Sequence, residues 1–250
     1  KLDNSKIEKI EIKAHKYKQW MRNGLNILIG NFRYIPEKLK RRFDANIVVK
    51  FENNLVCIFT GRMRHSGDEK DHIKLLGNSI IQSLDIHLSN GNISGITKFK
   101  LLIPESREIF EDEIFVTELL RELNYLAPRT SYVDVKINDV NTKMIFQEKA
   151  AKELLEFNLR REGPILEGDE RFLLRLVEAA NLPDNQLSNF SIGAVPLLEA
   201  GANAAFARQI NTNWIMRSKK HAIISYNSLS NLNNAYLLYS NRYKDEKNNF

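Results

Sequence analysis

The stretch that decides the fold runs from Thr97 to Glu156. It reads TKFKLLIP (Thr97–Pro104), then ESREIFEDEIFVTELLREL (Glu105–Leu123), then, after three residues, APRTSYVDVKINDVNTKMIFQEKAAKELLE (Ala127–Glu156). In order, these segments predict a lysine-bearing strand that stops at a proline, an acidic amphipathic helix, a two-stranded hairpin and the start of another helix. We therefore expect a small β-rich lobe with one inserted helix.

Strands are also predicted upstream of this stretch. Ile47 to Thr60 (IVVKFENNLVCIFT) has two β-branched runs around a polar turn, which is typical of a hairpin, and SLDIHL (Ser83–Leu88) alternates as a strand does. Residues 3–24 predict a helix that is broken near Ala14. The apolar residues of that helix recur at roughly helical spacing: Ile7, Ile10, Ile12, Tyr17 and Trp20.

The predicted helix from Glu111 to Leu123 has an apolar stripe that we expect to be buried. Its members are Ile114, Phe115, Leu119, Leu120 and Leu123. After Gly163-Pro164 the pattern changes, and residues 169–181, 194–210 and 229–240 predict helices. Strands thus dominate before about residue 165 and helices after it, which indicates an α+β lobe followed by a helical lobe.

Composition excludes several classes of site. The single cysteine, Cys57, excludes an internal disulfide and cysteine-rich metal centres. No run of eighteen apolar residues exists, so we expect no membrane span in this chain. The chain opens without Met or an apolar leader and closes on a polar stretch, so we expect a fragment.

The net charge of +6 is concentrated near the N-terminus. Residues 1–50 hold 13 Lys and Arg against 5 Asp and Glu, whereas the rest of the chain is slightly acidic. The segment KLKRRF (Lys38–Phe43) could contact phosphate or an anionic surface, or it could be a solvated face. No nucleic-acid-binding motif accompanies it, so we expect no specific nucleic-acid partner.

An ordered set of short blocks resembles the CotH kinase family, atypical protein kinases named after a bacterial spore-coat protein. The set covers roughly residues 60–170. The blocks are Arg64-x-x-Gly67-Asp68-x-x-Asp71-His72, Phe99-Lys100-Leu101 with Pro104 and Arg107, Glu113, Ala127-Pro128-Arg129, VDVKIND, Gln147-Glu148-Lys149, Lys152-Glu153-Leu154 and Arg161-Glu162-Gly163-Pro164.

The resemblance implies a two-lobed, protein-kinase-like α+β fold. ATP and Mg²⁺ would bind between the lobes, and Ser or Thr hydroxyls of a protein substrate would accept the phosphoryl group. The chain would divide into a basic helical extension (1–46), a kinase-like N-lobe (47–165) and an incomplete helical C-lobe (166–250). Neither GxGxxG nor GxxxxGK[ST] occurs, in keeping with a family that lacks the usual glycine-rich loop.

Phosphoryl transfer relies on positioning and on charge neutralisation, so a strand lysine should reach the nucleotide and a helix carboxylate should hold that lysine. Lys98 and Lys100 share one face of their strand, and Lys100 is the first choice because it lies inside the FKL block. Both could instead be solvent-facing. Glu113 and Glu118 flank the apolar stripe of the helix equally well, and the resemblance favours Glu113.

Two further groups of residues are candidates for nucleotide binding. Arg62, Arg64, Gly67 and Asp68 precede or enter a polar loop that could approach phosphate, although Asp68 could instead fix a turn. By analogy with kinases, Phe146-Gln147-Glu148 is the hinge to the second lobe. There Glu148 could contact ribose or adenine, or could cap the next helix.

Two features of the sequence argue against catalysis by this chain. Asp85 lies where many relatives carry a basic residue, so Lys98 or Lys100 would have to compensate, or the chain is inactive. Residues 165–250 also show no convincing acids for Mg²⁺, and the metal ligands are expected beyond Phe250. The alternatives are a nucleotide-binding pseudokinase or scaffold, and a non-enzymatic interaction domain with a basic N-terminus.

Overall fold

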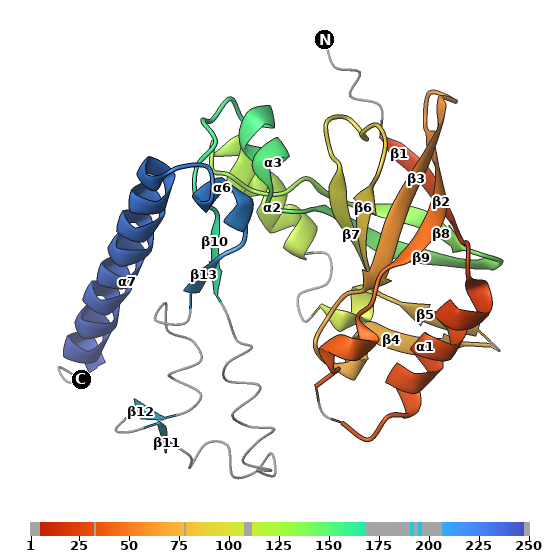
Figure 1. Ribbon diagram of the computed structural model, residues 1–250, viewed down its shortest axis with the longest axis horizontal. Helices are drawn as coiled ribbons and strands as arrows, with labels where there is room; N and C mark the ends of the chain where they lie inside the picture. Colours follow the sequence, from red (N-terminus) through yellow and green to blue (C-terminus); the bar gives the residue numbers. More distant parts are fainter. Residues whose placement is uncertain are drawn as a thin grey trace. The chain divides into compact units, whose positions relative to one another are not determined.

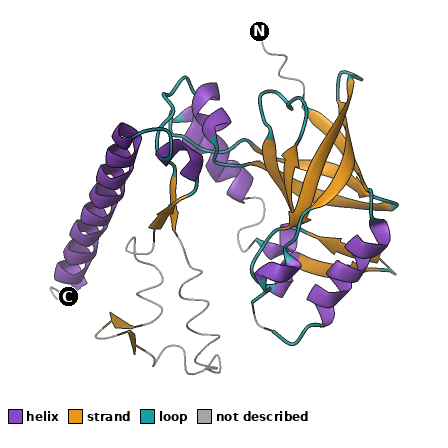
Figure 2. Cartoon of the chain, viewed as in Figure 1, coloured by secondary structure: helices purple, strands orange, loops and turns teal. Residues whose placement is uncertain are grey.

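The computed structural model describes residues 6–32, 34–77, 79–107, 112–168, 191–192, 195–196 and 207–247. The chain forms two compact units, Lys1–Arg160 and Arg161–Phe250. The first unit is mostly β and the second carries a long helix (Figures 1 and 2).

The first unit is a closed barrel, with the strand order β1-β2-β3-β6-β7-β9-β8. All neighbouring strands are antiparallel except β1 and β8, whose parallel pairing closes the barrel. In sequence order the strands are β1 (Ile7–Ala14), β2 (Phe43–Phe51), β3 (Val56–His65), β6 (Leu84–Leu88), β7 (Lys98–Leu102), β8 (Thr130–Ile137) and β9 (Val140–Glu148).

The barrel forms because its strands alternate between apolar and polar residues over most of their length; the exceptions are the consecutive buried residues Leu101 and Leu102 in β7 and 144–146 in β9. The apolar set points inward and fills the interior, as expected for a barrel of this size. Each fully buried Ile, Leu or Phe contributes about 1.5–3 kcal/mol through burial of apolar surface. Core residues come from all seven strands, for example Ile10, Val49, Met63, Ile86, Phe99, Val135 and Met144.

The expected two-lobed, protein-kinase-like fold is wrong, because the first unit is this closed barrel. The difference arises at Ile7–Ala14, which forms β1 where the sequence predicted a helix over residues 3–24. Ile10, Ile12 and Ala14 alternate into the core, so the relevant period is two. The helix α1 begins only at Tyr17 and ends at Ile29. The segment expected to be a helical extension therefore supplies the strand that closes the barrel.

Several local predictions are confirmed. The hairpin predicted at residues 47–60 is β2 and β3, and Asn54 in its turn has a positive φ of 64°. The strand predicted from SLDIHL is β6, and the second predicted hairpin is β8 and β9. The two predicted helices that flank this hairpin are α2 (Asp112–Glu122) and α3 (Lys152–Phe157).

The prediction that the apolar stripe of α2 is buried is wrong. Phe115 is 66% exposed, and Leu119 and Leu123 are also exposed, whereas Glu113 and Thr117 are buried. Thr117 Oγ1 donates to the Glu113 carbonyl oxygen, which satisfies its own hydroxyl within the helix. A helix that buries a carboxylate in preference to its apolar side chains departs from the usual pattern, and such departures concentrate at functional sites.

A smaller core lies where α1 packs on the hairpin of β4 (Ile73–Leu76) and β5 (Ser79–Gln82) (Figure 1). Ile27 of α1 meets Ile73 and Ile80 there. Three 3₁₀ turns complete the first unit: η1 (Glu37–Leu39), η2 (Lys70–His72) and η3 (Pro104–Ser106).

His65, the last residue of β3, is 1% exposed. Its Nδ1 lies 3.1 Å from Gln82 Oε1, and the two form a hydrogen bond when the proton is on Nδ1, because an amide oxygen only accepts. Its Nε2 is buried without a hydrogen-bond partner. Burial lowers the pKa of His65 to about 4, although the hydrogen bond to Gln82 acts in the opposite direction.

The second unit has two short β pairs and two helices in its described part. These elements are β10 (Leu166–Gly168), β11 (Ser191–Ile192), β12 (Val195–Pro196), β13 (Ala207–Gln209), α6 (Thr212–Ile215) and α7 (Lys219–Lys247). The helix predicted at 229–240 is confirmed within α7. The helix predicted at 169–181 lies outside the described residues, and the one predicted at 194–210 is wrong at 195–196 and 207–209, which are strands. Among the described residues, no helix is both long and apolar enough to cross a bilayer.

Candidate functional site

A row of polar side chains crosses the outer face of the barrel in direct register. Arg64 on β3 pairs with Asp85 on β6, Asp85 pairs with Lys100 on β7, and Lys100 pairs with Gln147 on β9. We call these four residues the polar row. Directly paired side chains lie about 4.5–5.5 Å apart at Cβ, so the row is continuous. The row points outward because its neighbours along the strands are core residues: Met63, Ile86, Phe99 and Phe146.

Asp85 is the centre of a dense charge cluster, although it is only 2% exposed. Its Oδ2 accepts from Lys149 Nζ at 2.9 Å, from Arg64 Nε at 3.2 Å and from Arg42 Nη2 at 3.5 Å. His87 Nε2 lies 3.2 Å from the other carboxylate oxygen, Oδ1. We call these five residues the Asp85 cluster. A buried carboxylate is tolerated only with such partners, because an unpaired buried charge is strongly unfavourable.

The cations of the Asp85 cluster outnumber its single anion. Burial would raise the pKa of the Asp85 carboxyl, but the interaction with His87 and the charge of Lys149 outweigh burial and hold that pKa well below its usual range. Arg42, Arg64 and Lys149 carry +3 against the −1 of Asp85, a net +2, and Glu37 Oε2 lies 4.0 Å from Arg64 Nη1 at the edge of the cluster.

The Asp85 cluster also holds polar atoms that its own side chains leave unsatisfied. His87 Nε2 is 3.2 Å from Arg42 Nη2 as well as from Asp85 Oδ1, and one ring nitrogen cannot accept from the first and donate to the second. Arg42 Nη1 is buried without a hydrogen-bond partner, and Asp85 Oδ1 has one only when His87 Nε2 donates to it. Spare positive charge beside an unsatisfied donor is a suitable environment for a bound anion.

A second charge cluster lies at the other end of the polar row. Arg107 grips the Glu113 carboxylate of α2 with two bonds, Nε to Oε2 at 2.6 Å and Nη2 to Oε1 at 2.9 Å. Gln147 Nε2 donates to the same carboxylate at 2.6 Å. This network explains why α2 buries Glu113, which is 7% exposed, in place of its apolar stripe. Arg107, Glu113 and Gln147 form the Glu113 cluster.

Lys100 and Arg107 both act electrostatically on His72. Burial lowers the pKa of His72, Asp71 raises it, and the positive charges of Arg107 and Lys100 lower it further. Both cations are therefore within electrostatic range of one imidazole. The polar row, the Asp85 cluster and the Glu113 cluster together form one charged surface, which we call the charged face.

The structure brings Lys100 and Glu113 together through Gln147, which pairs with Lys100 and binds Glu113. The two hydrogen bonds that hold the Glu113 carboxylate come from the guanidinium of Arg107, however, and not from a lysine of β7. Arg62 and Lys98 are exposed and share the outer side of their strands, where each is paired with His87. Six predicted residues thus lie on or beside the charged face: Arg62, Arg64, Lys98, Lys100, Glu113 and Gln147.

Two other candidates point into the barrel. Phe146 packs against Phe99 in the core, with ring centroids 4.9 Å apart. Glu148 accepts the fork of Arg129, from Nε at 2.8 Å and from Nη2 at 2.9 Å. Arg129 also lies over the ring of Phe157. In this structure Glu148 therefore fixes the end of the barrel, and no side chain caps α3.

The two candidates in the loop before η2, Gly67 and Asp68, already contact other side chains of the protein. Asp68 binds the buried ammonium of Lys40. Gly67 has φ of +111°, and a Cβ there would lie 2.1 Å from His72 Cδ2. Glycine is therefore required at position 67 so that His72 can pack against the loop.

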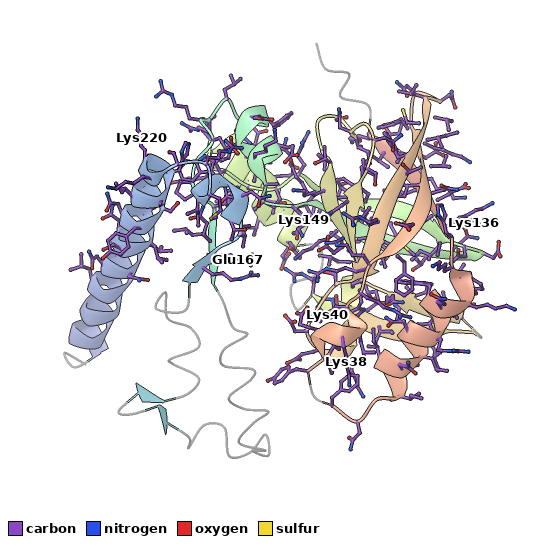
Figure 3. The ribbon with its side chains drawn as sticks, viewed as in Figure 1. Lys38, Lys40, Lys136, Lys149, Glu167 and Lys220 are labelled. Carbon is purple, nitrogen blue, oxygen red and sulfur yellow. The ribbon has the colours of Figure 1, made fainter. Side chains whose placement is uncertain are left out.

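Sequence reasoning missed Arg42, His87 and Lys149 as members of the site. Asp85 was noted only as a departure from the family pattern. The available signal was the strand SLDIHL, whose alternation puts Asp85 and His87 on one face. The sequence presents KLKRRF as one basic segment, but its cations separate in the structure: Lys40 binds Asp68, Arg42 joins the Asp85 cluster, and Lys38 is exposed (Figure 3).

Comparison with protein-family models and with curated proteins gives no match. The resemblance to the CotH kinases therefore rests on the residues quoted above. Among the residues that the structure describes, no group of three or more His, Cys, Asp and Glu could hold a metal ion. The carboxylates of Asp85 and Glu113 are already bound by cationic side chains, so neither fits Mg²⁺ as it stands.

Proposed function

We propose that the charged face binds the phosphate groups of a nucleoside triphosphate, ATP being the ligand that the family resemblance favours. The observation that supports this most is the excess of cations around a buried carboxylate. Arg64, Lys149 and Arg42 are anchored by Asp85, yet each side chain keeps 25–33% of its surface exposed. A phosphate oxygen could therefore be bound by groups that are already oriented, which reduces the entropy lost on binding.

The two buried acids have positioning roles in this proposal. Asp85 would orient Arg64 and Lys149, and Glu113 would orient Arg107. Lys100 lies between the two clusters in the polar row, which makes it the side chain best placed to bridge phosphate groups bound at either end. This arrangement supports the hypothesis that Lys100 supplies the positive charge that many relatives place at position 85, where this chain has Asp85.

Phosphoryl transfer to a Ser or Thr hydroxyl of a protein is the reaction that we propose for this face. Mg²⁺ would neutralise charge on the transferred phosphoryl group. Its ligands would have to be residues other than Asp85 and Glu113, because both are engaged. A pseudokinase would use the same face to bind nucleotide without transfer.

Calorimetric titration of the full chain with ATP, with and without Mg²⁺, tests the proposal. Arg64→Gln and Lys100→Met should each weaken binding at least about tenfold, because each removes a charge-assisted contact of about 1.5–3 kcal/mol. Lys136→Met is the matched control, since Lys136 lies on β8 away from the charged face (Figure 3). Equal affinity in all three variants, or no binding at millimolar ATP, would refute it. Transfer of labelled phosphate to a protein mixture separates a kinase from a pseudokinase.

A further inference from the structure

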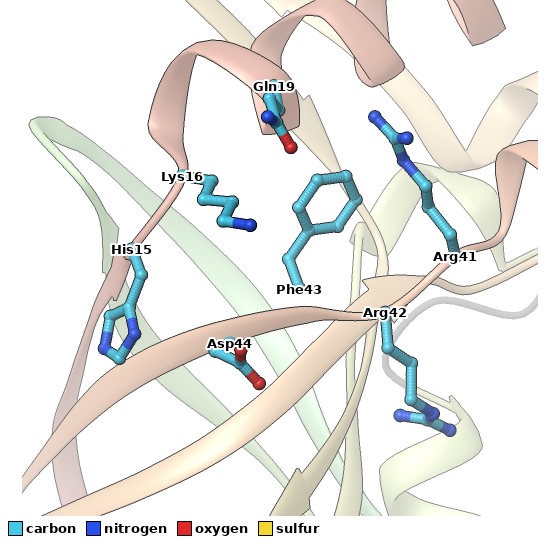
Figure 4. Close-up of a pocket in the computed structure, with 7 residues that line it drawn as sticks. All are labelled: His15, Lys16, Gln19, Arg41, Arg42, Phe43 and Asp44. Carbon is cyan, nitrogen blue, oxygen red and sulfur yellow. The ribbon is translucent and has the colours of Figure 1, made fainter.

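A pocket of about 160 Å³ lies at the start of α1, against the first residues of β2. Its lining residues are His15, Lys16, Gln19, Arg41, Arg42, Phe43 and Asp44. Figure 4 shows the Lys16 amine turned toward the ring of Phe43, and Arg41 and Arg42 leaving adjacent positions in opposite directions. Arg42 therefore serves the Asp85 cluster, whereas Arg41 remains with the pocket.

The floor of the pocket is a packed aromatic ring. The Phe43 ring is buried, and Trp20 packs on it edge-on with ring centroids 5.4 Å apart. The guanidinium carbon of Arg41 lies 4.9 Å from the centre of the same ring. This cation–π contact restricts a side chain that would otherwise be mobile, so its charge is held at the pocket.

The charge at this pocket is the opposite of what helix stability alone would favour. Lys16 occupies the N-cap of α1, no side chain caps the helix, and no acidic residue lies in its first turn. A helix N-terminus carries partial positive charge, so a lysine there is unfavourable unless an anion is present. Asp44 is the single carboxylate in the lining, against Lys16 and Arg41 within the pocket.

We infer that this pocket is a second anion site, which binds a phosphate group that is either free or the monoester of a small molecule. The volume accommodates several waters at about 30 Å³ each, and so a group of five heavy atoms. Lys16 and Arg41 supply the charge, and the Gln19 amide supplies a neutral donor at the rim. Of the lining residues, Arg42 alone also belongs to the charged face, and the inference does not depend on nucleotide binding there.

The test is titration of the full chain with inorganic phosphate at constant ionic strength, followed by amide NMR shifts. Saturable shifts should occur at residues 16–20 and at Arg41, Phe43 and Asp44, and Arg42 is left out of the readout because it also belongs to the Asp85 cluster. Lys16→Ala with Arg41→Ala should weaken binding at these amides at least tenfold. Lys18→Ala with Lys38→Ala removes the same charge from the same two segments without touching the pocket lining, and should change the affinity less than twofold.

Equal weakening in both double variants, or shifts that only grow linearly with phosphate, would overturn the inference, because either result means general screening. Arg64→Gln should leave these shifts intact, so failure of nucleotide binding and failure of this site are distinguishable. A parallel titration with glycerol 3-phosphate identifies the source of the group. Tighter binding than inorganic phosphate indicates an ester, and equal or weaker binding indicates the free ion.

Discussion

Acidification should destabilise the barrel through His65. The folded state holds its imidazole neutral, with a pKa lowered from 6.5 to about 4. Because the unfolded chain binds this proton first, the stabilisation is complete above pH 6.5 and is lost as the pH falls through about 4. A shift of about 2.5 units corresponds to about 3 kcal/mol of unfolding free energy. That is a large part of the 5–15 kcal/mol typical of a whole domain.

Urea unfolding between pH 8 and pH 4 measures this effect when wild type is compared with His65→Gln. A Trp214→Phe background leaves Trp20 in the barrel core to report on the first unit. The difference in unfolding free energy between wild type and His65→Gln should fall by about 3 kcal/mol between pH 7 and pH 4. The subtraction matters because burial also lowers the pKa of His72, which adds a change of the same sign to both proteins.

Two results would refute the reasoning about His65. One is a difference between wild type and variant that stays constant from pH 7 to pH 4. The other is an NMR titration of the His65 ring with a midpoint at or above pH 6. The same NMR experiment should show the proton on Nδ1 at neutral pH, because Gln82 Oε1 accepts from it.

Three other substitutions test the packing of the first unit by urea unfolding. Asp85→Asn should destabilise by about 3 kcal/mol, because three cations lose their buried partner, whereas Asp134→Asn on an exposed strand position should change stability by less than about 0.5 kcal/mol. Glu113→Gln should cost about 2 kcal/mol and Glu118→Gln under about 1 kcal/mol, since only the first acid is buried with a two-bond arginine; equal losses would contradict the Glu113 cluster. Gly67→Ala should cost more than about 2 kcal/mol through its collision with His72, but Gly77→Ala, with a positive φ and open space, only about 1 kcal/mol.

The local elements were largely predictable, since alternation over four or more residues is enough to recognise β2, β3, β6, β8 and β9. The closure of the barrel was not predictable. Ile10 and Ile12 alone are too few to establish a period of two, and their strand partners on β8 lie more than a hundred residues away. A local sequence pattern does not indicate pairing between strands so far apart in the chain.

The candidate site was predictable in part for a related reason. The sequence suggests Lys100 and Glu113 as a pair, and in the structure Gln147 is the strand partner of Lys100 and donates a hydrogen bond to Glu113. The outward apolar stripe of α2 was not predictable, because hydrophobic periodicity assumes that apolar residues face the nearest core. Arg107 and Gln147 reverse that preference by satisfying a carboxylate, and such a network depends on residues from three separate elements.

The parallel pairing of β1 with β8 has a consequence for synthesis of the chain. Lys9 pairs with Asp134, so one side of the first strand waits for 125 further residues to be translated. At about 5–20 residues per second this takes roughly 6–25 s, during which β1 has an open edge that can pair with other chains. The protein should therefore be most prone to misassembly while it is a nascent chain on a crowded polysome. Its need for chaperones should be greatest at that stage.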